Sequence, residues 1–182
     1  LDYFDYETGI YHKNIYAERN PGVVQELGDV GNDIQIYGNK LYAIINCSHF
    51  VEVMNVETAK HITQISIPNC RYIVFKDKYA YVSSYAGPVK IDPNARLGYV
   101  ARVDTTTLTV KDTCVVGYQP EEMVIVGNKL YVANSGGYRV PNYDRTVSVI
   151  DLNTFKVIKT IDVGINLHRM ELDQYGNIYV SS

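Results

Sequence analysis

Four pairs of polar or aromatic residues stand where strands are expected to begin, and their chemistry suits ligand binding. They are Asn32 and Asp33, Arg71 and Tyr72, Glu121 and Glu122, and His168 and Arg169. Together they supply carboxylate, amide, phenol, imidazole and guanidinium groups, which hold polar ligands through hydrogen bonds and charge. We would expect hydrophobic residues at these positions if they served only for packing. The pairs therefore predict the polar floor of a binding site.

Two long segments rich in tyrosine and charge would form the walls of the same site. Residues 83–98 read SSYAGPVKIDPNARLG, and residues 134–146 read NSGGYRVPNYDRT. Tyrosine suits a wet binding surface because its ring is apolar and its hydroxyl is polar. The candidate ligand-binding residues in these segments are Tyr85, Tyr138, Arg139 and Tyr143.

Signals for catalysis or for a metal are weaker. The four histidines stand in different sequence contexts, and the chain has no HxH, HExxH or nucleophile-elbow motif. Glu121 and Glu122 could act with His168 in proton transfer if the three side chains lie close enough. In an enzyme, the candidate ligands of a divalent metal are Asn32, Asp33, Glu121 and Glu122. We assign no catalytic residue and expect no cofactor.

The elements that position these residues follow from a repeat. The motif Asp/Asn-x-x-Thr starts at Asp5, Asn55, Asp104 and Asp151, with spacings of 50, 49 and 47 residues. Asp or Asn at the start of a turn accepts hydrogen bonds from backbone N–H groups just ahead of it. Each motif therefore predicts a tight turn between two strands rather than a catalytic carboxylate.

A second turn signal lies between these motifs. It reads GNKLY at 38–42, DKYAYV at 77–82, GNKLYV at 127–132 and GNIYV at 176–180. Each combines a turn pair with an alternating apolar run, which indicates a hairpin, and no segment has a sustained helical period. Each repeat unit thus contains four short antiparallel strands, A to D. Such a unit, repeated every roughly 40–50 residues, is typical of a β-propeller blade. A β-sandwich is the alternative, but it needs no sequence repeat.

The predicted fold class is therefore all-β, a propeller with about four blades' worth of strands. We place a single domain over residues 1–182. Its parts are a half blade at 1–27, blades at 28–67, 68–116 and 117–163, and a half blade at 164–182.

Variation in length points to one face of this domain. The distance from the strand-B tyrosine to the next turn motif ranges from 13 residues after Tyr42 to 23 after Tyr81. The extra residues fall in the B–C connections and, around residues 17–29, in the first D–A connection. Both kinds of connection open on the same face of an up-and-down blade. Repeat proteins gather insertions on their binding face, so we expect the ligand there.

Composition argues against several classes of protein. The chain of 182 residues has a net charge of −3 and is 46% hydrophobic, which argues against nucleic-acid binding and against disorder. No apolar run approaches the roughly 20 residues of a membrane-spanning helix. The cysteines match no disulfide framework or zinc pattern, so we expect buried or half-buried thiols at Cys47, Cys70 and Cys114.

Five stretches of the chain resemble YncE-like, surface-layer-type β-propeller proteins of Bacteroidetes. They are YFDYETG, LGDVGNDIQIYGNKLY, NCRYIVFKDKYAYVSS, PEEMVIVGNKLYVANSGG and TVSVIDLNTFKVIKTIDVG. The resemblance implies seven blades, a lipoprotein signal, and export to the periplasm or the outer-membrane surface. Some relatives resemble surface lipoproteins that capture cobalamin for a TonB-dependent transporter, so the resemblance implies a corrinoid as one ligand to test.

The strand count is smaller than this resemblance implies. It gives strands C and D, three full blades, and then strands A and B. We expect a fragment of a larger propeller. In the alternative, the terminal halves pair into one composite blade and close a four-bladed ring.

Three functions are consistent with the sequence. The leading hypothesis is an exported, non-enzymatic propeller that binds a small molecule on its loop-rich face, with an outer-membrane transporter as partner. The second is a metal-dependent propeller enzyme of the lactonase or lyase type. The third is a scaffold that binds another protein through the same face.

Overall fold

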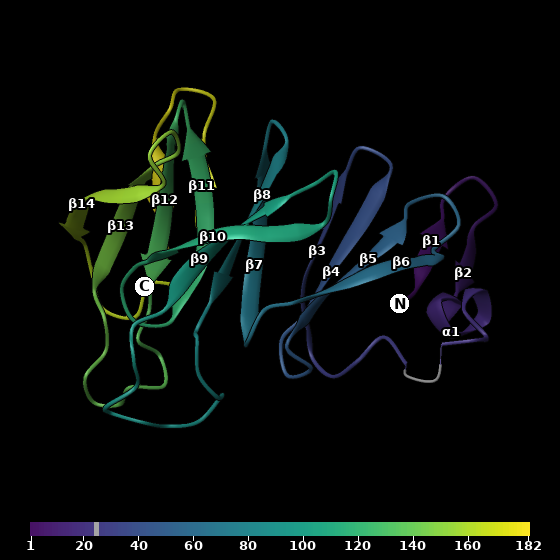
Figure 1. The fold of residues 1–182 in the computed structure, drawn as a ribbon, viewed down its shortest axis with the longest axis horizontal. Helices are drawn as coiled ribbons and strands as arrows, with labels where there is room; N and C mark the ends of the chain where they lie inside the picture. The colour runs from purple at the N-terminus through teal and green to yellow at the C-terminus, as the bar shows by residue number, and fades with distance from the viewer. Residues whose placement is uncertain (24–25) are drawn as a thin grey trace.

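The computed structural model describes residues 1–23 and 26–182. Three four-stranded antiparallel sheets follow one another along the chain, and a two-stranded sheet lies beyond each end of the series (Figure 1). Within each four-stranded sheet, strands that are consecutive in sequence are neighbours, so the sheet is an up-and-down meander. The prediction of an all-β chain built from four-stranded blades is confirmed.

We call the three complete sheets the first, second and third blades. The first blade contains β3 (Gly31–Tyr37), β4 (Lys40–Ile45), β5 (Phe50–Asn55) and β6 (His61–Ser66). The second contains β7 (Cys70–Lys76), β8 (Tyr79–Ser84), β9 (Tyr99–Asp104) and β10 (Thr109–Val115). The third contains β11 (Pro120–Val126), β12 (Lys129–Asn134), β13 (Thr146–Asp151) and β14 (Lys156–Asp162). The terminal sheets pair β1 (Tyr3–Asp5) with β2 (Ile10–His12), and β15 (Met170–Leu172) with β16 (Ile178–Val180).

The Asp/Asn-x-x-Thr motifs form the predicted tight turns. Asn55 Oδ1 accepts hydrogen bonds from the backbone N–H groups of Glu57 at 3.1 Å and Thr58 at 2.9 Å. The other three motifs make the same pair of bonds. The residue after each motif threonine has a positive φ, and these residues are Gly9, Ala59, Leu108 and Phe155. The side-chain bonds hold a chain reversal that L-residues otherwise adopt rarely.

Hydrophobic cores lie between neighbouring blades. Tyr42 on β4 is only 1% exposed and packs against Phe75 of the second blade, with ring centroids 4.9 Å apart. Tyr81 occupies the equivalent position on β8 and packs with Met123 and Leu130 of the third blade. Each complete blade therefore presents its strand-B tyrosine to the next blade in the series.

The first D–A connection contains a short helix, α1 (Ile15–Arg19). With five residues it is too short to give a helical period in the sequence. The Tyr16 side chain is buried against the first blade, and its hydroxyl donates to Glu52 Oε1 at 3.1 Å. The long connection predicted around residues 17–29 begins inside this helix, and its residues 24–25 lie outside the described part of the chain. No helix in the described ranges is long and apolar enough to cross a membrane.

The expectation for the cysteines is correct at two positions. Cys70 and Cys114 are buried free thiols, and burial raises the pKa of Cys70 to about 12. Cys47 is an exposed free thiol, contrary to the prediction, because it lies in the connection that joins β4 to β5.

The series of blades forms an open arc. The inner strands β3, β7, β11 and β15 lie side by side in that order. Within the described residues the two terminal sheets remain separate and do not pair with each other, so this structure lacks the composite blade of a four-bladed ring (Figure 1).

Candidate functional site

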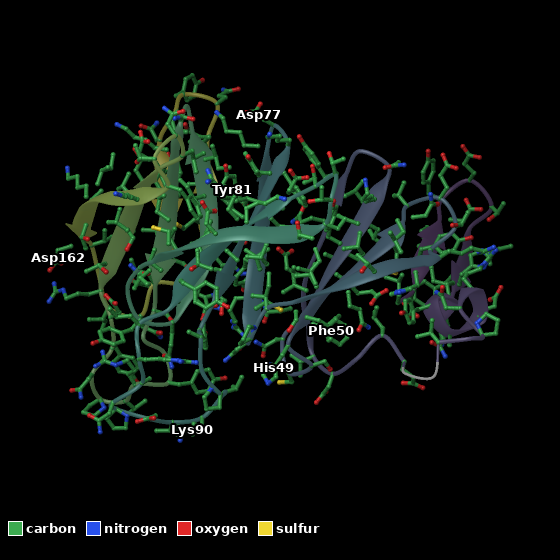
Figure 2. The ribbon with its side chains drawn as sticks, viewed as in Figure 1. His49, Phe50, Asp77, Tyr81, Lys90 and Asp162 are labelled. Carbon is green, nitrogen blue, oxygen red and sulfur yellow. The ribbon has the colours of Figure 1, made fainter. Side chains whose placement is uncertain are left out.

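The long connections gather at one end of the blades, which we call the loop-bearing end. They include residues 85–98 between β8 and β9 and residues 135–145 between β12 and β13. The turns between the first and second strands of the blades, at 38–39, 77–78 and 127–128, lie at the opposite end. Figure 2 shows His49 and Lys90 at the loop-bearing end and Asp77 at the opposite end.

In the three complete blades, the inner strand carries its predicted polar pair at a β-bulge, whereas His168 and Arg169 come just before β15. The pairing register shifts between Gly31 and Asp33 in β3, between Cys70 and Ile73 in β7, and after Pro120 in β11. A bulge leaves backbone groups out of the ladder and re-aims side chains. The bulges therefore explain why polar residues interrupt an otherwise apolar strand at this end.

Several of these polar side chains tie one blade to the next. Asn32 Nδ2 donates to the Arg71 carbonyl at 2.7 Å, and Asp33 Oδ2 accepts from the Ile73 N–H at 3.0 Å. Glu122 Oε2 accepts from the Met170 N–H at 2.6 Å. These bonds pair with backbone groups at the start of the neighbouring inner strand. Polarity at these positions therefore does not by itself indicate a ligand, because it also serves packing between blades.

A buried cluster lies between the second and third blades. The Arg71 Nε donates to Glu121 Oε2 at 3.0 Å, and the Tyr85 hydroxyl donates to Glu121 Oε1. The Arg71 guanidinium also lies over the Tyr85 ring, 4.7 Å from its centroid. Burial, and then the charge of Glu121, raise the pKa of Tyr85, so its hydroxyl stays protonated as a donor. Tyr85 is 3% exposed and so belongs to the floor of the site rather than to its walls.

A second group meets beside this cluster. The Tyr72 and His168 rings meet edge to face, with their centroids 6.1 Å apart. The Arg169 guanidinium carbon lies 5.2 Å from the centroid of the Tyr72 ring. Arg169 also contacts Glu122 at 3.2 Å, and its side chain is 59% exposed. The structure thus brings all four predicted pairs together near the inner strands, and Arg169 is the most open member of this group.

The predicted wall residues behave differently from one another. Tyr138 lies beside Tyr85, with ring centroids 6.2 Å apart, and remains partly exposed. Arg139 donates to the Asn142 carbonyl of its own segment at 2.8 Å, and its guanidinium lies 3.5 Å from the ring centroid of Tyr118, which precedes β11. Tyr143 is exposed and, in the described part of the chain, makes no ring contact with Tyr85 or Tyr138. Only Tyr138 therefore stands as a wall next to the floor.

One hollow at this end does not follow from the sequence. It has a volume of about 320 Å³ and lies between Tyr85, Gln119 and the 87–96 segment. Its charged lining residues are Lys90, Asp92 and Arg96. We call this hollow the loop pocket. The segment was recognised as a wall, but sequence cannot show which of its side chains turn inward.

Gln119 does have a signal in the repeat. It and Asn69 occupy equivalent places before an inner strand, and both have a positive φ. Gln119 Oε1 accepts from the Tyr138 N–H at 2.6 Å, and Asn69 Nδ2 donates to the Gly87 carbonyl at 2.8 Å. An amide side chain just before the inner strand therefore fixes the long connection of its own blade. Its recurrence at Asn69 and Gln119 is a signal that the sequence contains.

The candidate metal ligands do not converge. Within residues 1–23 and 26–182, no group of three or more His, Cys, Asp or Glu side chains is placed to hold a metal ion. Asn32 and Asp33 bond backbone groups of the second blade, and Glu121 is bonded to Arg71 and Tyr85.

Four-stranded meanders arranged around adjacent inner strands, with long connections at one end, define a protein of the β-propeller class. The chain belongs to the family described as a domain of unknown function, DUF5074, whose model matches residues 1–182. A comparison with curated protein sequences finds no match.

Solved structures similar to this chain support the same fold class. Hydrazine synthase of Kuenenia stuttgartiensis matches with a TM-score of 0.67 and 20% identity, over 79% of this chain and 40% of that chain. The WD40 β-propeller domain of Doa1 matches with a TM-score of 0.63 and 16% identity, over 82% and 47%. BamB of Moraxella catarrhalis matches with a TM-score of 0.63 and 12% identity, over 83% and 40%. The chain spans less than half the length of each of these structures, and identities this low show the fold alone.

Proposed function

We propose that this chain binds a small molecule, without catalysis, at its loop-bearing end. The observation that carries the proposal is the loop pocket of about 320 Å³. Its floor is the buried Tyr85, which Glu121 and Arg71 hold in place. A pocket with a fixed floor costs little conformational entropy when a ligand binds.

The lining of the loop pocket favours a ligand with an anionic or strongly accepting group. Lys90 and Arg96 are exposed cations on its rim. Asp92 lies 3.9 Å from Lys90, so this contact leaves most of the lysine's charge available to solvent. Tyr138 stands beside the floor and supplies an aromatic face for a planar group.

The resemblance to YncE-like, surface-layer-type proteins supports a more particular role. On that basis we propose a chain exported to the periplasm or the outer-membrane surface, where it passes its ligand to a TonB-dependent transporter. A corrinoid is the ligand that the resemblance suggests. It is larger than the loop pocket, so only part of it would be enclosed and the rest would lie across Tyr138 and Arg169.

Isothermal titration with cyanocobalamin tests the proposal. The wild-type chain should release or absorb heat with saturable one-site binding. Arg96→Glu should weaken binding by about tenfold or more, because one charge-assisted hydrogen bond is worth about 1.5 kcal/mol.

The matched control is Lys129→Glu, which makes the same change of charge at the opposite end of the third blade. It should leave the affinity unchanged. The absence of heat at micromolar concentrations removes the corrinoid as ligand. Equal losses in the two variants would place the binding site elsewhere.

A further inference from the structure

Gln119 lines the loop pocket although it is only 2% exposed. Its Oε1 accepts from the Tyr138 N–H at 2.6 Å, and this bond fixes which branch of the amide is the oxygen, because a backbone N–H can only donate. Within residues 1–23 and 26–182, the other branch, Nε2, forms no hydrogen bond and is not sealed by surrounding atoms. A buried donor without an acceptor costs free energy, so Gln119 Nε2 is a group that a bound ligand can satisfy.

The position of this donor is set before any ligand arrives. The Gln119 carbonyl accepts from the Ser135 N–H at 3.2 Å and from Ser135 Oγ at 2.9 Å. The Asp92 N–H donates to the Tyr138 carbonyl at 2.8 Å and so joins the two long connections to each other. A donor that is already ordered loses little conformational entropy when a ligand binds to it.

A cation without an ionic partner lies in the same lining. A Cβ added at Gly87 would lie 3.8 Å from Arg96 Nε, so the Arg96 side chain folds back over the start of its own connection. In the described part of the chain, Arg96 takes part in no ion pair. By contrast, Asp92 Oδ1 accepts from the Asn94 N–H at 2.9 Å, and its Oδ2 lies 3.9 Å from Lys90 Nζ. The Arg96 guanidinium therefore remains available to a ligand.

The lining of the loop pocket has a net charge of +1, because Lys90 and Arg96 are its cations and Asp92 is its anion. A carboxylate carries one negative charge at pH 7, whereas a phosphate monoester carries about −1.5 to −2. The planar guanidinium of arginine also matches the two oxygens of a carboxylate. The charge and the donors of the loop pocket therefore suit a carboxylate.

The rest of the ligand meets an apolar surface. Tyr85, Pro88 and Ala95 line the pocket beside its polar residues, and Tyr138 lies next to Tyr85. The volume of about 320 Å³ is at the small end of the roughly 300–1,000 Å³ that is usual for ligand pockets. The enclosed part of the ligand is therefore compact, such as a single ring that carries the acid group.

We infer that the loop pocket takes a carboxylate group of its ligand, held by Gln119 Nε2 and the Arg96 guanidinium, with an apolar part of the ligand against Tyr85. This inference rests on the proposed binding of a small molecule at the loop pocket, but not on the choice of a corrinoid. Arg96 is exposed and attracts any anion from solution, whereas Gln119 offers its N–H groups from one fixed place. Gln119 is thus the residue that selects a ligand by its accepting group.

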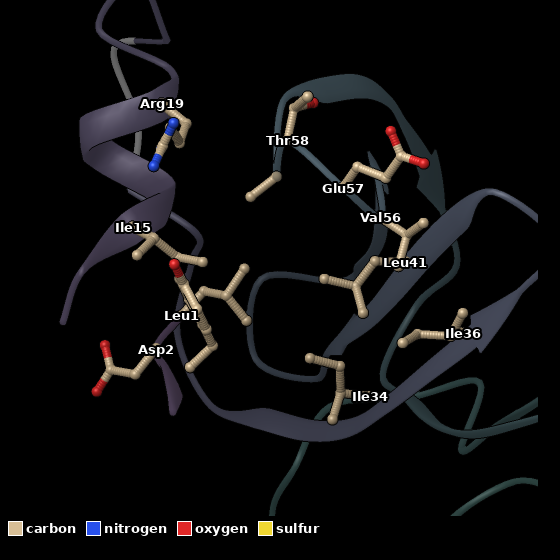
Figure 3. A pocket seen from close by; sticks show the side chains of 12 residues that line it. Leu1, Asp2, Ile15, Arg19, Ile34, Ile36, Leu41, Val56, Glu57 and Thr58 are labelled. Atoms are coloured by element: carbon tan, nitrogen blue, oxygen red, sulfur yellow. The ribbon is translucent and has the colours of Figure 1, made fainter. Parts of the chain in front are cut away.

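A second hollow provides an internal comparison (Figure 3). It has a volume of about 440 Å³, lies beside α1, and is lined chiefly by aliphatic side chains such as Ile15, Ile34 and Leu41. Among its described lining residues there is no asparagine or glutamine. An aromatic ring suits either hollow, whereas a carboxylate on that ring should favour the loop pocket.

Titration with three ring compounds of similar shape, followed by nuclear magnetic resonance, tests the inference. Benzoate carries a carboxylate, benzamide is its neutral isostere, and benzamidine is its cationic isostere. In the wild-type chain, benzoate should shift the side-chain N–H signals of Gln119. It should bind about tenfold more tightly than benzamide, because hydrogen bonds to a charged acceptor are the stronger ones. Benzamidine should bind least, and the signals of Ile34 and Leu41 should not depend on the charge of the compound.

Gln119→Glu replaces the free donor by a carboxylate oxygen and keeps an acceptor for the Tyr138 N–H. This variant should bind benzoate about tenfold more weakly and should prefer benzamidine. The matched control is Gln64→Glu, which makes the same change at an exposed position on β6 and should keep the wild-type order. The order among the three compounds in the wild type does not depend on how either variant folds.

Equal affinities of the wild type for benzoate and benzamide would overturn the inference and leave the loop pocket as a site for another class of ligand. An unchanged order of the compounds in folded Gln119→Glu would do the same. Shifts confined to the hollow beside α1, or no shift with any of the three compounds, would also overturn the inference. The titration with cyanocobalamin decides the proposed function separately.

Discussion

Single side chains at the turns hold each unit of the repeat in shape. The carboxylate of Asp104 accepts hydrogen bonds from the N–H groups of Thr107 and Thr106, and these bonds lower its pKa below the usual 3.8. The pKa values of Asp5 and Asp151 are also lowered, chiefly by hydrogen bonds with Thr8 and Thr154. A carboxylate with a lowered pKa in the folded state stabilises the fold fully above its unfolded pKa. That contribution is lost as the pH falls through the lowered value.

Asp104→Asn should flatten this acid dependence. Asparagine keeps the accepting oxygen, as Asn55 does at the equivalent turn, but it does not titrate in this range. We expect the free energy of unfolding to fall less steeply below pH 4 than in the wild type, with little change at pH 7. Urea denaturation at a series of pH values measures this.

The reciprocal variant is Asn55→Asp, which adds a titrating turn and should make the fall steeper. If the free energy of unfolding varies with pH in the same way for the wild type and both variants, the turn carboxylates have the same pKa in the folded and unfolded states, which contradicts this prediction.

Between neighbouring elements, bulged inner strands are joined by polar bonds rather than by apolar contacts alone. The Arg71–Glu121 pair links β7 to β11 and is well buried, with side-chain exposures of 12% and 4%. The Glu122–Arg169 pair links β11 to the last hairpin and is open to solvent at its arginine. Breaking a buried ion pair leaves an uncompensated charge, whereas breaking an exposed one costs little.

Glu121→Gln should therefore destabilise the fold by about 3 kcal/mol, because it leaves the Arg71 guanidinium buried without its counter-charge. Glu122→Gln is the matched control, with the same substitution at the adjacent residue. It should cost less than about 1 kcal/mol, because Gln can still accept from the Met170 N–H and Arg169 is exposed. Denaturant unfolding gives both values. Similar losses of unfolding free energy in the two variants would mean that burial does not make the Arg71–Glu121 pair more stabilising than the exposed Glu122–Arg169 pair.

The strands and turns were predictable from sequence because each depends on local chemistry. The Asp/Asn-x-x-Thr turns and the alternating runs carry their own signals, and the structure contains them. The polar pairs of the inner strands were also predictable, because they interrupt a local apolar run. Their bonds to neighbouring blades were not predictable, because Asp33 and Ile73 are far apart in sequence. Tyr85 was assigned to a wall and lies in the floor, since a loop residue's direction depends on packing with Glu121.

At the scale of the whole molecule, the two ends of the blades differ in the length of the connections that they carry. One end has only short turns, and the other has the long connections and the loop pocket. The strands supply the rigid frame, and the connections vary without disturbing it. We therefore propose that ligand binding occurs at the loop-bearing end.

Hydrogen–deuterium exchange with and without cyanocobalamin tests the central assignment most directly. Peptides that cover residues 85–98 and 135–145 should exchange more slowly when the ligand is bound, because bound ligand shields these backbone groups. Peptides that cover the turns at 38–39, 77–78 and 127–128 should be unaffected. Protection confined to those turns, or no protection at either end, would contradict the account.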